Sequence, residues 1–85
     1  MPVISRFFGV AIYMYHFDHG DPHFHAVYGE YEVSVPVQSG RVHGTFPRQA
    51  LRHVMDWAER HEAELLVNWD LAGQGKALNH IAPLE

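Results

Sequence analysis

A cluster of histidines and aspartates between positions 16 and 25 holds the side chains best suited to chemistry in this chain. Its members are His16, Asp18, His19, Asp21, His23 and His25. Imidazole nitrogens and carboxylate oxygens bind zinc and other divalent transition metals, and a catalytic zinc site needs only three protein ligands plus water. These six residues are therefore candidate ligands of zinc, manganese or nickel.

The local sequence indicates how two of these ligands come together. Loop-forming residues, including Gly20 and Pro22, precede an alternating run that begins at His23, and this pattern is typical of a loop that leads into a strand. On a strand, His23 and His25 project from one face while Phe24 projects from the other. The pair can then share one metal with ligands from the preceding loop.

A purely structural role for the same residues is equally consistent with the sequence. Asp18 and His19 can orient the loop by hydrogen bonding to backbone amides, as aspartate does in turns. His23 and His25 can hydrogen bond to acidic residues of the following strand, or face solvent and bind nothing. The spacing matches no well-defined metal motif such as the helical His-Glu-x-x-His, so both interpretations stay open.

Clustered imidazoles also predict a dependence of stability on pH. If His19, His23 and His25 lie close together, each protonated ring disfavours the protonation of the next. Their pKa values in the folded protein are then expected to lie below those in the unfolded chain.

Length and composition are typical of one small globular domain covering residues 1–85. The chain is 47% hydrophobic and 13% aromatic, which is enough for a packed core. Because it contains no cysteine, disulfides and thiolate ligands are excluded, and any metal must be bound by nitrogen and oxygen. A reducing cytoplasm is the expected location.

The charge and the apolar run at residues 7–15 argue against several functions. A formal net charge of −4 makes binding to nucleic acid unfavourable. The apolar run is too short to span a membrane and lacks the cleavage site of a secretion signal. No serine lies in a nucleophile motif and no glycine-rich loop opens a helix, so the sequence assigns no catalytic residue and leaves open whether the protein is an enzyme.

Alternating residues predict an antiparallel sheet of about four strands. The first is expected over residues 7–15, with apolar side chains on both faces. The next two are expected to form a hairpin around Gly29-Glu30, because glycine suits the first central position of a type II′ turn. That turn places Phe24 opposite Val35 on the apolar face of the sheet.

A second hairpin is expected around Ser39-Gly40. The apolar face continues into a fourth strand if Val35 lies opposite Gly44. Pro36 conflicts with a strand that is paired on both sides, because proline has no N–H to donate to a neighbour. We therefore expect either a bulge at Pro36 or a neighbouring strand that ends early.

Apolar residues then recur at helical spacing from Pro47 to Ala72. Pro47 suits the first helical turn, and Gly73 and Gly75 supply the stop. The span is long for one helix in a small domain, and polar residues around His61 favour a bend or break there. One or two C-terminal helices are thus expected to cover the apolar face of the sheet, which makes the fold α+β.

The segments at residues 18–26, 28–32, 65–69 and 75–76 resemble a known family of small bacterial proteins, domain-of-unknown-function family 4160. The most specific likeness is a proline-histidine-aromatic-histidine string followed by tyrosine-glycine. Asp21 stands where members usually carry a second proline, a departure that adds a carboxylate here. The resemblance implies a short cytosolic protein, often encoded beside another small uncharacterised protein, as in a toxin–antitoxin or regulatory pair.

Two functions from different classes follow from these observations. The first is a divalent-metal-binding domain, hydrolytic if the metal keeps an open position, that uses the cluster at residues 16–25. The second is a non-enzymatic interaction module that pairs with a neighbour-encoded protein or with a second copy of the chain. Exposure of Tyr13, Tyr15 or Trp57 beside the histidine loop would favour the second function.

Overall fold

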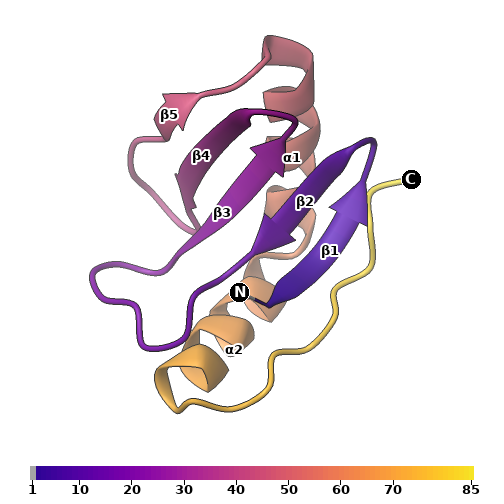
Figure 1. Ribbon diagram of the computed structural model, residues 1–85. Coiled ribbons are helices and arrows are strands. Elements are labelled where there is room, and N and C mark those ends of the chain that lie inside the picture. Colours follow the sequence, from indigo (N-terminus) through magenta and orange to yellow (C-terminus); the bar gives the residue numbers. More distant parts are fainter. Residues whose placement is uncertain (1) are drawn as a thin grey trace.

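The computed structural model describes residues 2–85 and contains five strands followed by two helices (Figure 1). The elements are β1 (Val3–Phe7), β2 (Val10–Tyr13), β3 (His23–Tyr28), β4 (Tyr31–Pro36), β5 (His43–Thr45), α1 (Arg48–Arg60) and α2 (Glu62–Gly73). The strands form one antiparallel sheet in the order β1-β2-β3-β4-β5. The predicted α+β fold, with an antiparallel sheet and C-terminal helices, is confirmed.

The β1–β2 hairpin corrects the prediction of a single strand over residues 7–15. Phe7 pairs with Val10, so Phe8 and Gly9 form a two-residue turn between them. Both turn residues have positive φ, 48° and 80°, as a type I′ turn requires. The apolar run conceals this turn because phenylalanine is not a usual turn residue, and the sheet therefore gains a strand.

The hairpin predicted around Gly29-Glu30 is confirmed. Phe24 lies opposite Val35, and Gly29 has a φ of 59°, as the first central position of a type II′ turn requires. The buried apolar side chains of β3 and β4, Phe24, Ala26, Val33 and Val35, consequently share one face of the sheet. His23 leaves the opposite face.

The strand after Ser39-Gly40 pairs two residues away from the predicted register. Val33, and not Val35, lies opposite Gly44. A shift of two residues keeps every side chain on its predicted face, so the apolar pattern does not distinguish the two registers. In the observed register β5 does not extend as far as Pro36, which fulfils the expectation that a neighbouring strand ends early.

Both helices lie on one face of the sheet, behind it in Figure 1. They are separated at His61, where a bend or break was expected. Pro47 precedes α1 instead of forming its first turn, and α2 ends at the expected Gly73. No helix in residues 2–85 is both long enough and apolar enough to cross a membrane.

The hydrophobic core lies between this face of the sheet and the two helices. Trp57 of α1 is fully buried, and its ring contacts those of Phe7 and Phe24 at centroid distances of 5.4 and 5.8 Å. Buried side chains from every layer join it: Ile4, Val10, Ile12, Ala26, Val33, Val35, Val54, Leu65 and Ile81. The opposite face of the sheet is thereby left for polar side chains.

The residues after α2 form an extended segment that runs beside β1 (Figure 1). The N–H of Ile81 donates to the carbonyl of Ile4 at 2.8 Å. Asn68, which is fully buried in α2, holds the backbone N–H and carbonyl of Asn79 through both atoms of its side-chain amide, at 2.8 and 2.9 Å. The segment covers the edge of the sheet at β1.

Candidate metal site

The loop between β2 and β3, residues 14–22, is held against the C-terminal end of α2. The N–H of Phe17 donates to the carbonyl of Ala72 at 3.1 Å. Gly75 permits this docking, because its φ of +70° favours glycine and a Cβ there would lie 2.6 Å from the Phe17 ring. The end of a helix thus fixes the position of the loop that supplies Asp18.

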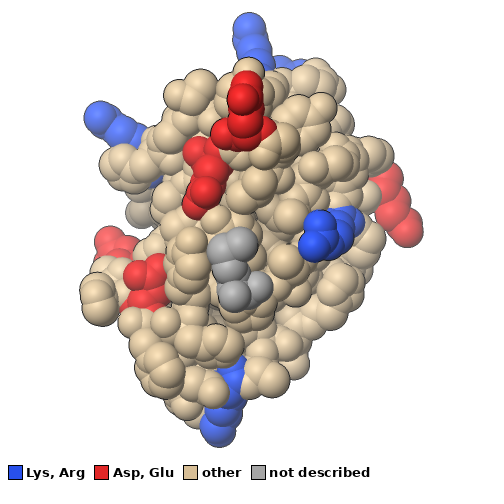
Figure 2. Space-filling model, in the orientation of Figure 1, with Lys and Arg blue, Asp and Glu red and all other residues tan. Residues whose placement is uncertain are grey.

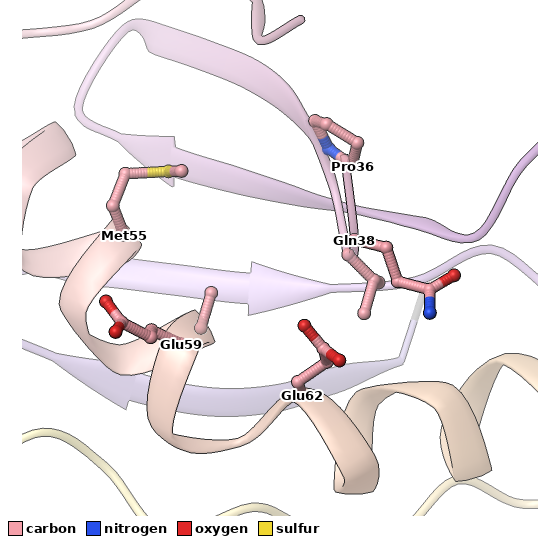
Figure 3. Close-up of a pocket in the computed structure, with 7 residues that line it drawn as sticks. Pro36, Gln38, Met55, Glu59 and Glu62 are labelled. Atoms are coloured by element: carbon pink, nitrogen blue, oxygen red, sulfur yellow. The ribbon is translucent and has the colours of Figure 1, made fainter. Parts of the chain in front are cut away.

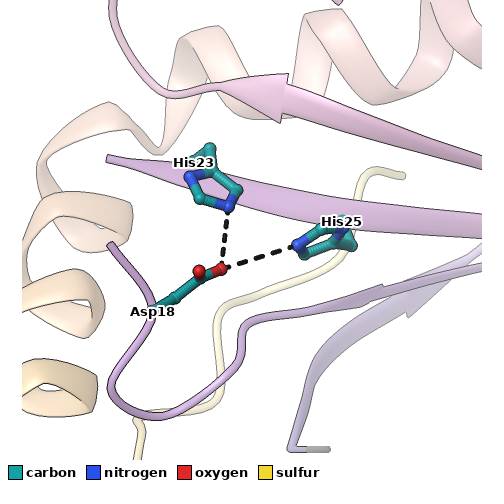
Figure 4. Close-up of side chains that lie close together, drawn as sticks. All are labelled: Asp18, His23 and His25. Carbon is teal, nitrogen blue, oxygen red and sulfur yellow. Dashed lines mark ion pairs between the residues drawn. The ribbon is translucent and has the colours of Figure 1, made fainter. Parts of the chain in front are cut away.

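Asp18, His23 and His25 converge at the start of β3 (Figure 4). Asp18 Oδ2 lies 2.8 Å from His23 Nε2 and 3.9 Å from His25 Nε2. One potential ligand atom from each residue lies within 4.8 Å of the other two. The three side chains are only 15–25% exposed, so the cluster is largely shielded from water.

The contacts of His23 define the roles of its two ring nitrogens. Nδ1 lies 2.9 Å from the carbonyl oxygen of Asp21, which can only accept, so Nδ1 must carry a proton. Nε2 then faces the Asp18 carboxylate either as a second N–H or with a lone pair directed at a shared cation. A backbone carbonyl on the far nitrogen is also the arrangement that orients histidines bound to metals.

Aromatic side chains from β2 and the following loop fix the ring of His25. Tyr13 stacks on it at a centroid distance of 5.3 Å, and Tyr15 meets it edge-on at 4.9 Å. Its Nε2 is buried and has no hydrogen-bond partner among the described residues. Leaving a buried polar group unpaired costs about 1–3 kcal/mol. In Figure 4 this nitrogen is directed toward Asp18.

The surroundings keep His25 neutral over a wider pH range than a free histidine. Burial lowers the pKa of His25, and the neighbouring His23 lowers it further, against the opposite influence of Glu32 and Asp18. The predicted repulsion between imidazoles therefore contributes, but burial is the larger cause. The neutral ring is the form that binds metal ions.

A tyrosine–glutamate pair lies on the other side of His25. The Tyr13 hydroxyl donates to Glu32 Oε2 at 2.6 Å, and burial, followed by this hydrogen bond, raises the pKa of Tyr13 far above its usual value. The same Glu32 oxygen lies 3.8 Å from His25 Nδ1. His25 is therefore flanked by carboxylates at both nitrogens.

In the described part of the chain, three of the six sequence candidates point elsewhere. His16 Nε2 donates to a backbone carbonyl of the C-terminal segment at 2.8 Å. The backbone N–H of His19 donates to Asp18 Oδ1 at 2.9 Å, while the His19 residue is exposed. Asp21 acts on His23 through its backbone carbonyl, and its side chain borders a neighbouring hollow.

Tyr13, Glu32 and Trp69 surround the cluster, and of these three residues the sequence points only to Glu32. Tyr13 lies opposite His25 in the β2–β3 ladder, and Trp69 contacts the ring of His23 at a centroid distance of 5.0 Å. The hairpin predicted at Gly29-Glu30 places Glu32 on the same face of the sheet as His25. Because a long loop precedes β3, the sequence does not predict that Tyr13 contacts His25 or that Trp69 contacts His23.

The cluster lies on the side of the sheet that the helices leave uncovered. Figure 2 shows that side of the molecule, where acidic and basic side chains are scattered in small groups among other residues. The visible face is therefore not dominated by one sign of charge.

These observations define the protein as an α+β domain that carries a histidine–aspartate cluster on the free face of its sheet. The family described as Domain of unknown function (DUF4160) matches residues 9–70, a span that includes all three residues of the cluster. The chain belongs to this family. No curated protein and no solved structure matches the chain.

Proposed function

We propose that the chain binds a divalent transition metal through Asp18, His23 and His25. Two imidazoles and one carboxylate are the donors of many catalytic zinc sites and of non-haem iron sites, both of which keep positions open for water or substrate. Two of the donors here come from alternate positions of one strand, and the third comes from a loop that a helix end fixes.

The unpaired nitrogen of His25 is the observation that carries this proposal. His25 Nε2 is buried without a hydrogen-bond partner among the described residues and lies 3.9 Å from the carboxylate of Asp18. A metal between them would satisfy both groups, whereas a purely structural role leaves the nitrogen unpaired. His23 supports the same site, because its Nδ1 is occupied by a carbonyl and its Nε2 is directed at the Asp18 carboxylate, with which it could share one cation.

Both distances from Asp18 to the histidine nitrogens need only a small adjustment, and the two histidine nitrogens, which lie within 4.8 Å of each other, must also approach. Donor atoms about 2.0–2.1 Å from a tetrahedral zinc ion lie about 3.3 Å from one another. The separation of Asp18 from His23, 2.8 Å, must lengthen, and that from His25, 3.9 Å, must shorten, each by about half an ångström. A displacement of the Asp18 carboxylate away from His23 and toward His25 changes both distances in the required direction.

Three protein ligands would leave a coordination position for water. A divalent cation with such a position lowers the pKa of bound water enough to supply hydroxide near neutral pH, for attack on a phosphoester or an amide. Glu32 Oε2 lies 3.8 Å from His25 Nδ1, and a shift that brought it within hydrogen-bond distance would let it orient a metal-bound histidine and raise its basicity. Hydrolysis is therefore the chemistry that the cluster fits best.

Calorimetric titration of untagged, chelator-treated protein tests the proposal. Zinc, manganese, nickel and, without oxygen, ferrous iron are added in turn, and at least one is expected to bind with a one-to-one ratio. Loss of a residue that only orients a metal ligand weakens metal binding about 10–100-fold. His23→Gln/His25→Gln removes two proposed ligands and is expected to weaken binding by more than that. His19→Gln/His80→Gln is the matched control, because both of its histidines are exposed.

Two results would contradict the metal site. One is binding weaker than millimolar for every metal in the series. The other is binding that the cluster variant retains at wild-type affinity, since the metal must then lie on other histidines.

A second candidate function is a non-enzymatic interaction module. Three aromatic side chains favour it, because Phe8, Phe17 and Tyr15 are 56%, 66% and 40% exposed, and exposed rings are enriched at protein interfaces. Of the three residues whose exposure was expected to signal this function, Tyr13 and Trp57 are instead buried. The partner would be a small protein encoded nearby or a second copy of the chain.

Co-expression with the neighbouring gene product, together with light scattering of the isolated chain, tests this second candidate. A complex or a dimer is expected, and Phe8→Ser/Tyr15→Ser is expected to weaken it. A strict monomer that does not bind the neighbouring product would count against the interaction module.

A further inference from the structure

We propose that a hollow beside His23 binds the phosphate group of a phosphoester, which selects phosphoesters over amides as ligands of the metal site. This inference rests on the proposed function, because the phosphate would be shared between the metal and the hollow. The hollow has a volume of about 200 Å³. Its polar border consists of Asp21, His23, Ser34, Ser39, Arg41 and His43.

The hollow borders the metal cluster, because His23 belongs to both. Ser34 lies opposite His25 in the β3–β4 ladder and opposite His43 in the β4–β5 ladder. Adjacent strands are about 4.8 Å apart, so the hollow extends outward from the cluster along the same face of the sheet. A ligand seated in it would have the cluster on one side and the β4–β5 connection on the other.

Hydrogen-bond donors predominate on the side formed by the β4–β5 connection. The guanidinium of Arg41 presents N–H groups in a planar fork that matches phosphate, and Ser39 adds a hydroxyl. The backbone N–H groups of Ser39, Gly40 and Arg41 make no backbone hydrogen bond within residues 2–85. A phosphate group has several oxygens that can accept hydrogen bonds from these donors at once, whereas an amide has a single carbonyl oxygen.

The base of the hollow is held in place before any ligand arrives. The N–H of Val37 donates to the carbonyl of Pro22 at 3.0 Å, which ties the end of β4 to the start of β3. Gly40 lies against the ring of Pro36, which a Cβ on that glycine would approach to 3.2 Å. The donors therefore belong to a connection that is packed against the sheet.

The local charge also favours an anion once a metal is bound. Asp21 and Arg41 offset each other at the border of the hollow, and a divalent cation would outweigh the single carboxylate of Asp18 there, since Glu32 lies at the other ring nitrogen of His25. The hollow between the end of β4 and the helices is different, because Glu59 and Glu62 lie on its helical side (Figure 3). That second hollow repels anions and serves as an internal reference.

Titration of the zinc-loaded protein with phenylphosphonate, a phosphoester mimic that cannot be hydrolysed, tests the inference. Arg41→Gln is expected to weaken phenylphosphonate binding about tenfold or more, because it removes charge-assisted hydrogen bonds. Arg52→Gln, which removes an equal charge from the exposed surface of α1, is the matched control and is expected to leave the affinity unchanged. Zinc affinity is expected to be the same in all three proteins.

A second probe separates the hollow from the metal itself. Acetohydroxamate binds to metals through its own two oxygens and has no phosphate group. Arg41→Gln is therefore expected to leave its affinity within about twofold of wild type. That difference is well below the tenfold change that corresponds to about 1.4 kcal/mol. Backbone amide shifts on addition of phenylphosphonate are expected at Ser39, Gly40 and Arg41 and not at Glu59 or Glu62.

The outcomes distinguish the two proposals. Zinc binding with phenylphosphonate affinity that is equal in wild type, Arg41→Gln and Arg52→Gln overturns the phosphate hollow and leaves the metal site intact. Equal loss of phenylphosphonate and acetohydroxamate affinity in Arg41→Gln also overturns it, because Arg41 then acts on the metal site as a whole. Failure of zinc and the other metals to bind contradicts the proposed function and this inference together.

Discussion

The two faces of β3 differ in packing and in polarity although their residues alternate one by one along the strand. Phe24 and Ala26 are fully buried against the helices. His23 and His25 project from the other face toward Asp18, where one buried nitrogen has no partner within the described residues. One face satisfies its side chains within the fold, and the other leaves a group that a ligand could satisfy.

The strand alone does not make the site. The alternation of β3 places the two imidazoles together, as any strand would. Asp18 arrives from a loop that the end of α2 holds, and Tyr13 stacks on His25 from β2. The chemistry of the polar face therefore depends on its neighbours, so substitutions on the two faces should have different effects.

The largest expected effect on stability comes from the buried face. Phe24→Ala removes a fully buried ring that contacts Trp57 at 5.8 Å, and it is expected to destabilise the fold by about 3–5 kcal/mol. His25→Ala in metal-free protein is expected to cost much less, because part of the lost packing is offset by removal of an unpaired nitrogen. Urea unfolding of both variants measures the two costs, and equal costs would contradict this division of roles.

The core face could be predicted from the sequence further than the polar face could. The turn at Gly29-Glu30 set the register of β3 and β4, because glycine in that position and matched apolar residues on one face agree. The strand after Ser39-Gly40 was misplaced by two residues, since that shift changes no side chain's face. The turn at Phe8-Gly9 was missed because it lies inside an apolar run.

The candidate site was only partly accessible from the sequence. The spacing of His23 and His25 is a local property, and it predicts their shared face. The choice of Asp18 as their partner depends on contacts between the loop and the distant end of α2. Nothing in the local sequence distinguishes Asp18 from Asp21, because both lie in the same loop and offer the same group.

A moderate effect is expected where the loop meets α2. Gly75→Ala places a Cβ 2.6 Å from the Phe17 ring at a φ of +70°, and it is expected to destabilise the fold by about 1–2 kcal/mol. It should also weaken metal binding, because the displaced loop carries Asp18. Gly73→Ala is the matched control, since a Cβ there meets no atom within 4 Å in residues 2–85.

Thermal unfolding and metal titration of the two glycine variants measure these effects. Gly73→Ala is expected to be neutral or slightly stabilising, because alanine favours the helix more than glycine does. If Gly75→Ala unfolds and binds metal as wild type does, the loop is not positioned by this contact.

The smallest expected effect is a dependence of stability on pH in metal-free protein. Burial and His23 lower the pKa of His25 in the folded state. As pH falls, His25 therefore becomes protonated in the unfolded chain before it does so in the folded protein. The contribution is fully present above about pH 6.5, the unfolded value, and is lost as pH falls toward the lower folded value.

Thermal unfolding from pH 8 to pH 5, for wild type and His25→Gln, measures this contribution. The wild type is expected to lose more stability than the variant over that range, because only the wild type has the shifted group. Parallel curves would mean that His25 is not held in the shielded environment described here.

The most direct test of the metal site is a crystal structure of the zinc-loaded protein with anomalous diffraction at the zinc edge. One strong anomalous peak is expected about 2.0–2.2 Å from His23 Nε2, His25 Nε2 and a carboxylate oxygen of Asp18. His23 Nδ1 should still donate to the carbonyl of Asp21. A peak on other histidines, or an Asp18–His23 contact that persists at 2.8 Å with no peak beside it, would contradict the metal site.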